Sequence, residues 1–172
     1  MGNNVSNFAI VRVSPTLDTS AYADNDVFFA ATEIPLAVRG NGGCALLHAI
    51  TILNEDDVAH DHDLVFMQKQ ANLGTLNDAV GSGSLWTNAL AKAAGVCGIV
   101  NIDHSTNQTD CVNNLIYHTS YGNHGAAVTS GLPLMLQAEG DSTSVFFAGI
   151  SRSGTPTTAA DDYEYAFHIQ YK

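Results

Sequence analysis

Large apolar side chains alternate with smaller or polar ones along the last ten residues of the chain. The odd positions from 163 to 171 hold Tyr, Tyr, Phe, Ile and Tyr, and the even positions between them hold Glu, Ala, His and Gln. A period of two is that of a β-strand with one buried face. The pattern therefore predicts a C-terminal strand whose aromatic side chains face the core.

Shorter runs of the same kind recur along the chain. They predict strands over 7–13, 45–53, 63–68, 97–102, 112–118, 132–137 and 144–151, with 125–129 as a weaker candidate. The segment 11–57 is interpreted as an entering strand, a polar crossing, a short strand and a long hairpin arm. The turn at 139–142 predicts a hairpin between its two flanking strands. Eight to ten strands joined by turns indicate a mainly β fold, an antiparallel β-sandwich or jelly roll.

One segment, from about residue 75 to 95, departs from this pattern. Leu85, Ala89, Leu90 and Ala93 lie at helical spacing, after Ser84 as a candidate N-cap and before Gly95 as a stop. Thr75 and Asp78 are candidates to cap a short helical turn over 76–80. We expect one helical excursion within a single β domain spanning 1–172, because no linker divides the chain. Residues 1–20 are a candidate extended arm, since Ser14-Pro15 favours extended backbone.

Charge narrows the range of partners. The chain has six Lys and Arg against seventeen Asp and Glu, a net charge of −11. Such a surface repels phosphate, so we expect no nucleic-acid partner. No apolar run approaches the roughly 20 residues of a membrane helix, so no membrane partner is expected either. Cys44, Cys97 and Cys111 are expected to be free thiols in a reducing cytoplasm, with a Cys97–Cys111 bridge as the alternative.

Two polar clusters are candidate metal sites. His60-Asp61-His62-Asp63 places two His two residues apart, so both side chains point to one side of an extended chain and suit a divalent ion. No third ligand follows at a defined spacing, and we expect a solvated hairpin loop there. Asp24-Asn25-Asp26 offers oxygen ligands for calcium, but it lacks the spacing of an EF-hand. We expect Asp24 and Asn25 to cap backbone groups in a turn.

No catalytic pattern is present in the sequence. It contains no Gly-x-Ser-x-Gly elbow and no phosphate-binding loop. We therefore expect a protein that is not an enzyme, with no catalytic residue, no cofactor and no metal. The interface candidates are Arg12, Pro15, Tyr22, Arg39 and Trp86.

The run SPTLDTSAYADNDVFF from Ser14, with the Gly-rich turn at 40–43 and a strand that ends in acidic residues, resembles a family of tailed-bacteriophage virion proteins. The resemblance continues more loosely through 63–79 and 146–169, but the cysteines and residues 60–63 have no counterpart in the family pattern. It implies a capsid decoration (cement) protein that bridges capsomers on the outer surface of the assembled head. The implied partners are the major capsid protein and two further copies in a homotrimer. The implied location is the virion, assembled in the host cytoplasm.

Two alternatives to this function remain open. One is another virion component, such as a head-fibre, tail or baseplate protein with a host- or glycan-binding role. The other is a metal-dependent hydrolase that uses His60 and His62.

Overall fold

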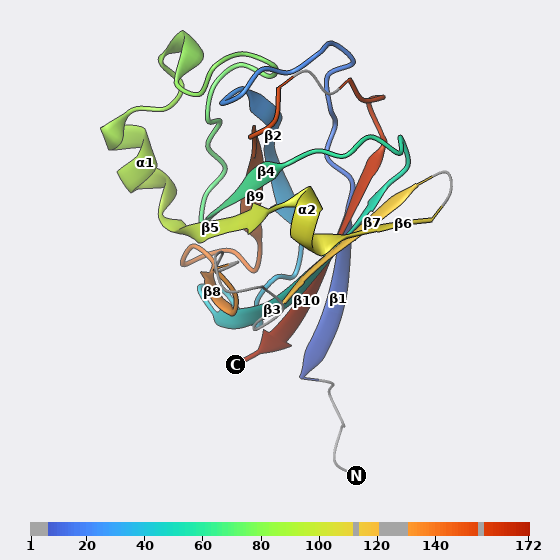
Figure 1. Cartoon of the computed structure of the whole chain (residues 1–172). Coiled ribbons are helices and arrows are strands. Elements are labelled where there is room, and N and C mark those ends of the chain that lie inside the picture. The colour runs from blue at the N-terminus through green and yellow to red at the C-terminus, as the bar shows by residue number, and fades with distance from the viewer. Residues whose placement is uncertain (1–6, 112–113, 121–130, 155–156) are drawn as a thin grey trace.

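The strands of the protein form two antiparallel sheets. The computed structural model describes residues 7–111, 114–120, 131–154 and 157–172. Sheet A has the order β1 (Phe8–Val13), β10 (Tyr163–Tyr171), β3 (Cys44–Asn54), β7 (Leu115–Ser120), β6 (Gln108–Asp110), and β8 (Leu134–Gln137) pairs with β3 beside β7. Sheet B has the order β2 (Val27–Ile34), β9 (Val145–Ser151), β4 (His62–Met67), β5 (Val96–Ile102). Figure 1 shows the strands of sheet A side by side, with β1 at one edge.

The order of pairing is that of a jelly roll. Strand β1 pairs with β10, β2 with β9, β3 with β7, and β4 with β5, all antiparallel. The chain is thus folded as nested antiparallel strand pairs. Neighbouring pairs meet where β10 pairs with β3 and where β9 pairs with β4. The predicted mainly β, jelly-roll-like sandwich is confirmed. No helix among the described residues is long and apolar enough to cross a membrane.

The turn at 139–142 does not close a hairpin, so that prediction was wrong. Strand β8 before the turn pairs with β3 in sheet A, whereas β9 after it pairs with β2 and β4 in sheet B. The turn therefore carries the chain from one sheet to the other.

The main core lies between the two sheets and is rich in aromatic rings. Phe147 of β9 meets Phe167 of β10 edge-on, with ring centroids 4.8 Å apart. The predicted alternation at the C-terminus is confirmed, because Tyr163, Tyr165 and Phe167 are fully buried.

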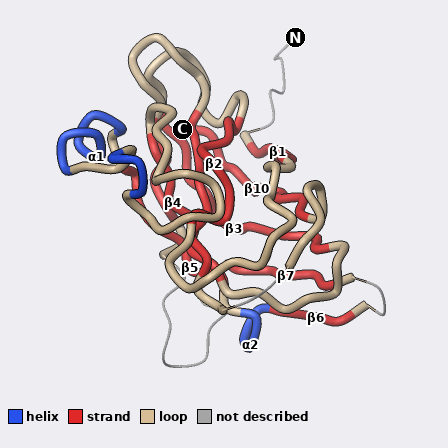
Figure 2. Tube along the Cα trace, turned by 90° about the horizontal axis from the view of Figure 1, so that it is seen from above, coloured by secondary structure: helices blue, strands red, loops and turns tan. Residues whose placement is uncertain are grey.

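The helical excursion covers the outer face of sheet B. Helix α1 (Asn88–Ala94) begins after Thr87, whose hydroxyl accepts the Leu90 N–H, and not after Ser84 as predicted. It ends at Gly95, as predicted, in the left-handed conformation (φ 63°). A second, smaller core lies beneath it, built from Val27, Ala31, Val65, Met67, Leu73, Ala94, Ala148 and Ile150, with Ala71, Val80 and Trp86 at its margin. Figure 2 shows α1 at the side of sheet B, away from β1 and β10.

Several further local predictions are settled by the structure. Residues 76–80 are not helical, because Leu76 and Ala79 form bridges to the start of β2 and the segment before it. The 3-10 turn Ser82–Ser84 (η1), strand β6 and the short helix α2 (His104–Asn107) were not predicted. The weaker strand candidate at 125–129 lies outside the described residues. The three cysteines are free thiols.

The N-terminal segment that was predicted to be an extended arm contains a strand of sheet A. From Phe8 to Val13 the chain is β1, paired residue by residue with β10 of the same molecule. This part of the segment belongs to the sheet because Val11 and Val13 pack against the main core.

Candidate functional site

The outer face of sheet A is the candidate site. On β1 the odd residues Val11 and Val13 face the core, so the even residues point outward. The outward side chains of three neighbouring strands form what we call the open face, made of Phe8, Ile10, Arg12, His48, Thr51, Leu53, Glu164 and His168. No element within the described part of the chain covers it.

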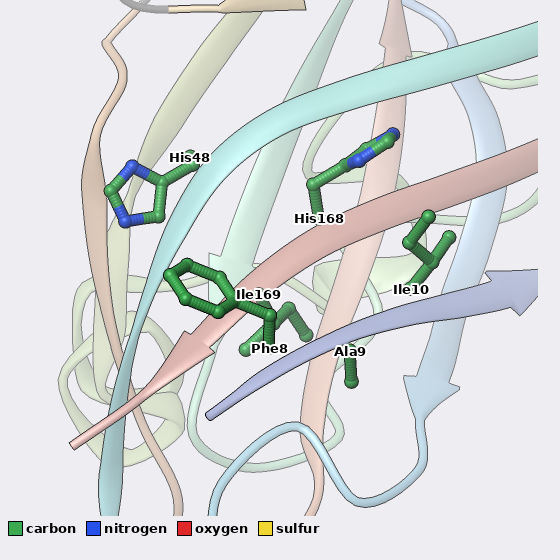
Figure 3. Close-up of a pocket in the computed structure, with 6 residues that line it drawn as sticks. All are labelled: Phe8, Ala9, Ile10, His48, His168 and Ile169. Carbon is green, nitrogen blue, oxygen red and sulfur yellow. The ribbon is translucent and has the colours of Figure 1, made fainter. Parts of the chain in front are cut away.

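A hollow of about 290 Å³ lies at the β1 end of the open face. Phe8 and Ile10 line it and are 62% and 56% exposed. His48 and His168 complete the lining, and Figure 3 shows these side chains projecting from β3, β10 and β1 around the hollow. The rings of Phe8 and His48 lie 6.5 Å apart, centroid to centroid. The hollow is thus concave, largely apolar and open to solvent.

A second hollow of about 130 Å³ continues the open face along the strands. It shares Ile10 and His168 with the first, and Thr51 and Leu53 extend it onto β3. Arg12 of β1 and Glu164 of β10 form an ion pair across its rim. The two hollows therefore form one surface with an apolar floor and a paired charge at its edge.

Hydrogen bonds hold the imidazoles of this face in place. The Thr51 hydroxyl lies 3.0 Å from His118 Nδ1 and 3.1 Å from His168 Nε2. His48 Nε2 lies 2.7 Å from the Gln170 side-chain oxygen. Partial burial, together with the nearby His118 and Arg12, lowers the pKa of His168. At neutral pH His168 therefore adds no charge to the face.

Acidic residues are nearly absent from the strands of sheet A. Of the seventeen Asp and Glu in the chain, two lie in these strands, Glu164 in β10 and Asp110 in β6. Glu164 is already paired with Arg12. The open face is therefore close to neutral on a chain with a net charge of −11.

Two of the five predicted interface residues are buried, and their assignment is corrected. Pro15 is buried, and Tyr22 is 1% exposed. The Tyr22 ring packs edge-on against Phe28, with centroids 5.1 Å apart, and its oxygen accepts the Asp18 N–H at 2.6 Å. Both residues are parts of the interior of the roll, so neither is available to a partner.

The other three candidates lie at separate places. Arg12 is on the open face. Arg39 stacks over the Tyr171 ring at 4.5 Å and donates to the Asn7 side-chain oxygen, at the end of β10. Trp86 is half-buried against the second core. Phe8 and Ile10 were not among the predicted interface residues, although the period of two along Phe-Ala-Ile-Val-Arg-Val places both on one face of the strand.

His60 and His62 are fully buried, so the predicted solvated loop is wrong. His62 Nδ1 donates to the His60 carbonyl at 3.2 Å, and its Nε2 accepts the Tyr165 hydroxyl at 3.0 Å. The Ser151 hydroxyl donates to the Ser153 carbonyl, which makes His60 Nε2 the donor to Ser151 Oγ at 3.1 Å. The even positions 60, 62, 64 and 66 hold His, His, Leu and Phe, all fully buried. Because these positions alternate along an extended chain, the pattern could have placed both histidines in the core with Leu64 and Phe66.

Burial keeps both of these histidines neutral. It lowers the pKa of His60 to about 3, with a smaller contribution from His62. It lowers the pKa of His62 to about 4. Since both His62 ring nitrogens have protein partners, this arrangement leaves neither for a metal ion. The pair is a structural part of the core.

The remaining acidic clusters are held by hydrogen bonds of the protein. The segment forms the predicted turn, but the residue that caps it is Asp26, which accepts the Ala23 N–H at 2.7 Å, and not Asp24 or Asn25 as predicted. Asp61, Asp103 and His104 place one ligand atom each within 4.8 Å of one another. Asp61 accepts the His104 backbone N–H at 2.7 Å and lies 2.5 Å from its Nδ1, and Asp103 caps α2. These bonds account for the cluster without an ion.

No protein-family model and no curated protein matches the chain. Among solved structures, a chain of Desmodium yellow mottle tymovirus aligns with 98% of this chain and 84% of its own length, with 14% sequence identity and a TM-score of 0.27. A TM-score this low does not establish a common fold. The jelly-roll assignment rests on the strand pairing of this molecule.

Proposed function

We propose that this chain is a virion structural protein of the capsid decoration type, which docks through the open face of sheet A onto the outer surface of an assembled head. The observation that carries the proposal is the pair of exposed side chains, Phe8 and Ile10, around a hollow on a nearly neutral face. The resemblance of residues 14–57 to phage virion proteins supplies the class of partner, the major capsid protein. Jelly rolls recur in viral capsid and lectin domains, which is compatible with this class.

The open face has the composition of a docking surface. Side chains of the size of Phe and Ile contribute about 1.5–3 kcal/mol each when they pass from full exposure to full burial, so both together would contribute at most a few kcal/mol. The Arg12–Glu164 pair and Thr51 lie at the margin, where a polar rim is typical. Because fifteen of the acidic residues lie outside the strands of sheet A, carboxylates do not oppose the approach of another protein along this face.

Stabilisation of the shell would follow from mass action. A protein that binds the assembled lattice and not its free subunits stabilises the lattice by its own binding free energy. Contact with two neighbouring capsomers, or association of several copies, multiplies the effect by avidity. The resemblance implies three copies at each site. No chemical step is part of this function.

The test is binding to heads assembled without this chain, taken from the virus that encodes it. Phe8→Asp places a charge in the docking surface, and Leu90→Asp is the matched control, an exposed apolar residue of α1. Co-sedimentation should show binding by the wild type and by Leu90→Asp. Phe8→Asp should bind at least about tenfold more weakly, because losing the burial of one Phe side chain costs more than about 1.4 kcal/mol of binding free energy.

Equal binding by Phe8→Asp and the wild type would contradict the proposed face. Failure of the wild type to bind heads would contradict the decoration function. Binding of the wild type to immobilised glycans in place of heads would support the alternative of a tail, baseplate or fibre protein.

A further inference from the structure

We propose that β1 is a pairing edge, through which two copies of this chain join their A sheets into one continuous antiparallel sheet. The proposal concerns the backbone edge of the sheet, while the side chains of Phe8, Ile10 and Arg12 on this strand also belong to the open face. The proposed partner is a second copy of the chain, because the backbone edge, the charges and a two-fold symmetry are all compatible with pairing of β1 with β1.

The edges of the two sheets differ in how they are protected. On the far side of sheet A the edge strands are β6, which has three residues and ends in Asp110, and β8, which has four residues. The edge of sheet B at β2 is irregular in its pairing with β9, and Leu76 bridges to Val27 at its start. At the other edge, β5, the backbone of Gly131 lies close against the Ile99 carbonyl. Short strands, irregular pairing and covering segments are the usual means of preventing edge-to-edge association.

Strand β1 is neither short nor irregular in its pairing. It is six residues long and pairs with β10 without a shift in register. Its sequence, Phe-Ala-Ile-Val-Arg-Val, contains no Pro and one charged residue. That residue, Arg12, forms an ion pair with Glu164 of the neighbouring strand. A regular, apolar edge strand of this kind is a template for another strand.

The hydrogen bond at the start of β1 determines which backbone groups face outward. The Asn7 carbonyl accepts the Tyr171 N–H at 2.8 Å, so Asn7 faces β10. Backbone groups alternate in direction along an antiparallel strand, so those of residues 9, 11 and 13 also face β10. The backbone N–H and C=O groups of Ile10 and Arg12 consequently face the outer edge.

This parity favours one arrangement of two copies. A two-fold axis at Ile10 makes the two Ile10 residues a directly opposed pair that exchange both of their backbone hydrogen bonds. Arg12 of each copy then lies opposite Phe8 of the other, where its guanidinium can stack on the ring. A register that opposed the two Arg12 residues would be disfavoured by like charge.

The charges of the chain also select this edge for self-association. Two copies with a net charge of −11 each repel one another over most orientations. Strand β1 contains no carboxylate, and Glu164 of the neighbouring strand β10 is paired with Arg12. The joined sheet would place two open faces side by side.

Solution mass tests the proposal directly. Light scattering after size exclusion, over a dilution series of the full chain, should give twice 18.1 kDa. Ile10→Lys places a charge on the axis and should weaken the dimer about tenfold or more. Met135→Lys, an equally exposed apolar residue on β8, is the matched control and should leave the dimer intact. A monomer at all concentrations would overturn the proposal. A mass of three times 18.1 kDa would overturn it too, because an isologous edge contact closes at two copies, and it would favour the homotrimer that the resemblance implies.

Cross-linking tests the register independently of affinity. In a chain whose three native cysteines are replaced by Ser or Ala, Ile10→Cys should oxidise to a disulfide-linked dimer. Opposed residues of a hydrogen-bonded pair have Cα atoms about 5.5 Å apart, within the range that a disulfide spans. Ile99→Cys, 55% exposed on β5, is the control and should remain a monomer. Equal cross-linking of the two variants would overturn the proposal.

Discussion

The outer faces of the two sheets differ in what covers them. The outer face of sheet B is covered by the chain itself, since Val65 and Met67 of β4 pack against Leu73 and Ala94 of the helical excursion. Within the described residues, the outer face of sheet A has no such cover and carries Phe8 and Ile10 at 62% and 56% exposure.

This difference points to where a partner would bind. A sheet with one apolar face becomes stable by burying that face against another element. On sheet B the connection between β4 and β5 buries the outer face. On sheet A no described element does so, and the scarcity of carboxylates there is consistent with the proposed contact with another molecule.

Acid is expected to have the largest effect, because it protonates the two histidines that are buried between the sheets. The pKa values of His60 and His62 are lowered from 6.5 to about 3 and about 4. Their contribution is complete above pH 6.5 and is lost as the pH falls toward these values, because the unfolded chain binds the protons first. From pH 7 to pH 5 the two together should cost about 4 kcal/mol of unfolding free energy. Urea unfolding at the two pH values measures the loss.

A variant of the open face separates the two groups of histidines. His168→Asn removes the open-face imidazole whose pKa is lowered and leaves the buried pair unchanged. The variant should keep most of the loss of stability that the wild type shows from pH 7 to pH 5. A loss that falls by half or more would place the acid sensitivity on the outer face.

Two methionines compare the covered and the open face with the same substitution. Met67 is fully buried in the second core, and Met135 is 58% exposed on the outward side of β8. Met67→Ala should lower the unfolding free energy by about 2–5 kcal/mol, since it leaves a cavity. Met135→Ala should change it by about 0.5 kcal/mol or less. Similar losses in urea unfolding of the two variants would contradict the assignment of covered and open faces.

The cap of α1 should give a smaller effect, confined to the cover of sheet B. The Thr87 hydroxyl accepts the Leu90 N–H at 3.3 Å. Thr87→Ala should cost about 1 kcal/mol, and Thr87→Ser should restore most of it. Hydrogen exchange should quicken at Leu90 and Ala91 and stay unchanged in β1 and β10. Faster exchange in both sheets would mean that the excursion is not a separate cover.

Alternation along the chain was enough to predict single strands and their faces. Tyr163, Tyr165 and Phe167 were placed correctly on the buried side because each lies two residues from the next. The same rule applied to 60–66 would have placed His60 and His62 in the core. Their polar neighbours Asp61 and Asp63 suggested a loop, although outward positions of a strand hold such residues equally well.

Which strands pair with one another could not be predicted from local pattern. The turn at 139–142 has the residues of a hairpin, yet β8 and β9 belong to different sheets. Their partners lie far away in sequence, and the long-range packing of β3 against β8 overrides the local turn signal. For the same reason the open face was not predicted, because it is assembled from β1, β3 and β10, which lie far apart in the sequence.

Electron cryo-microscopy of particles of the virus that encodes this chain tests the central claim most directly. We expect β1, β10 and β3 to lie against the shell, with Phe8 and Ile10 buried in the contact and α1 on the side facing away. Contact through α1 and sheet B, with Phe8 and Ile10 exposed to solvent, would contradict it, and so would particles that lack the chain.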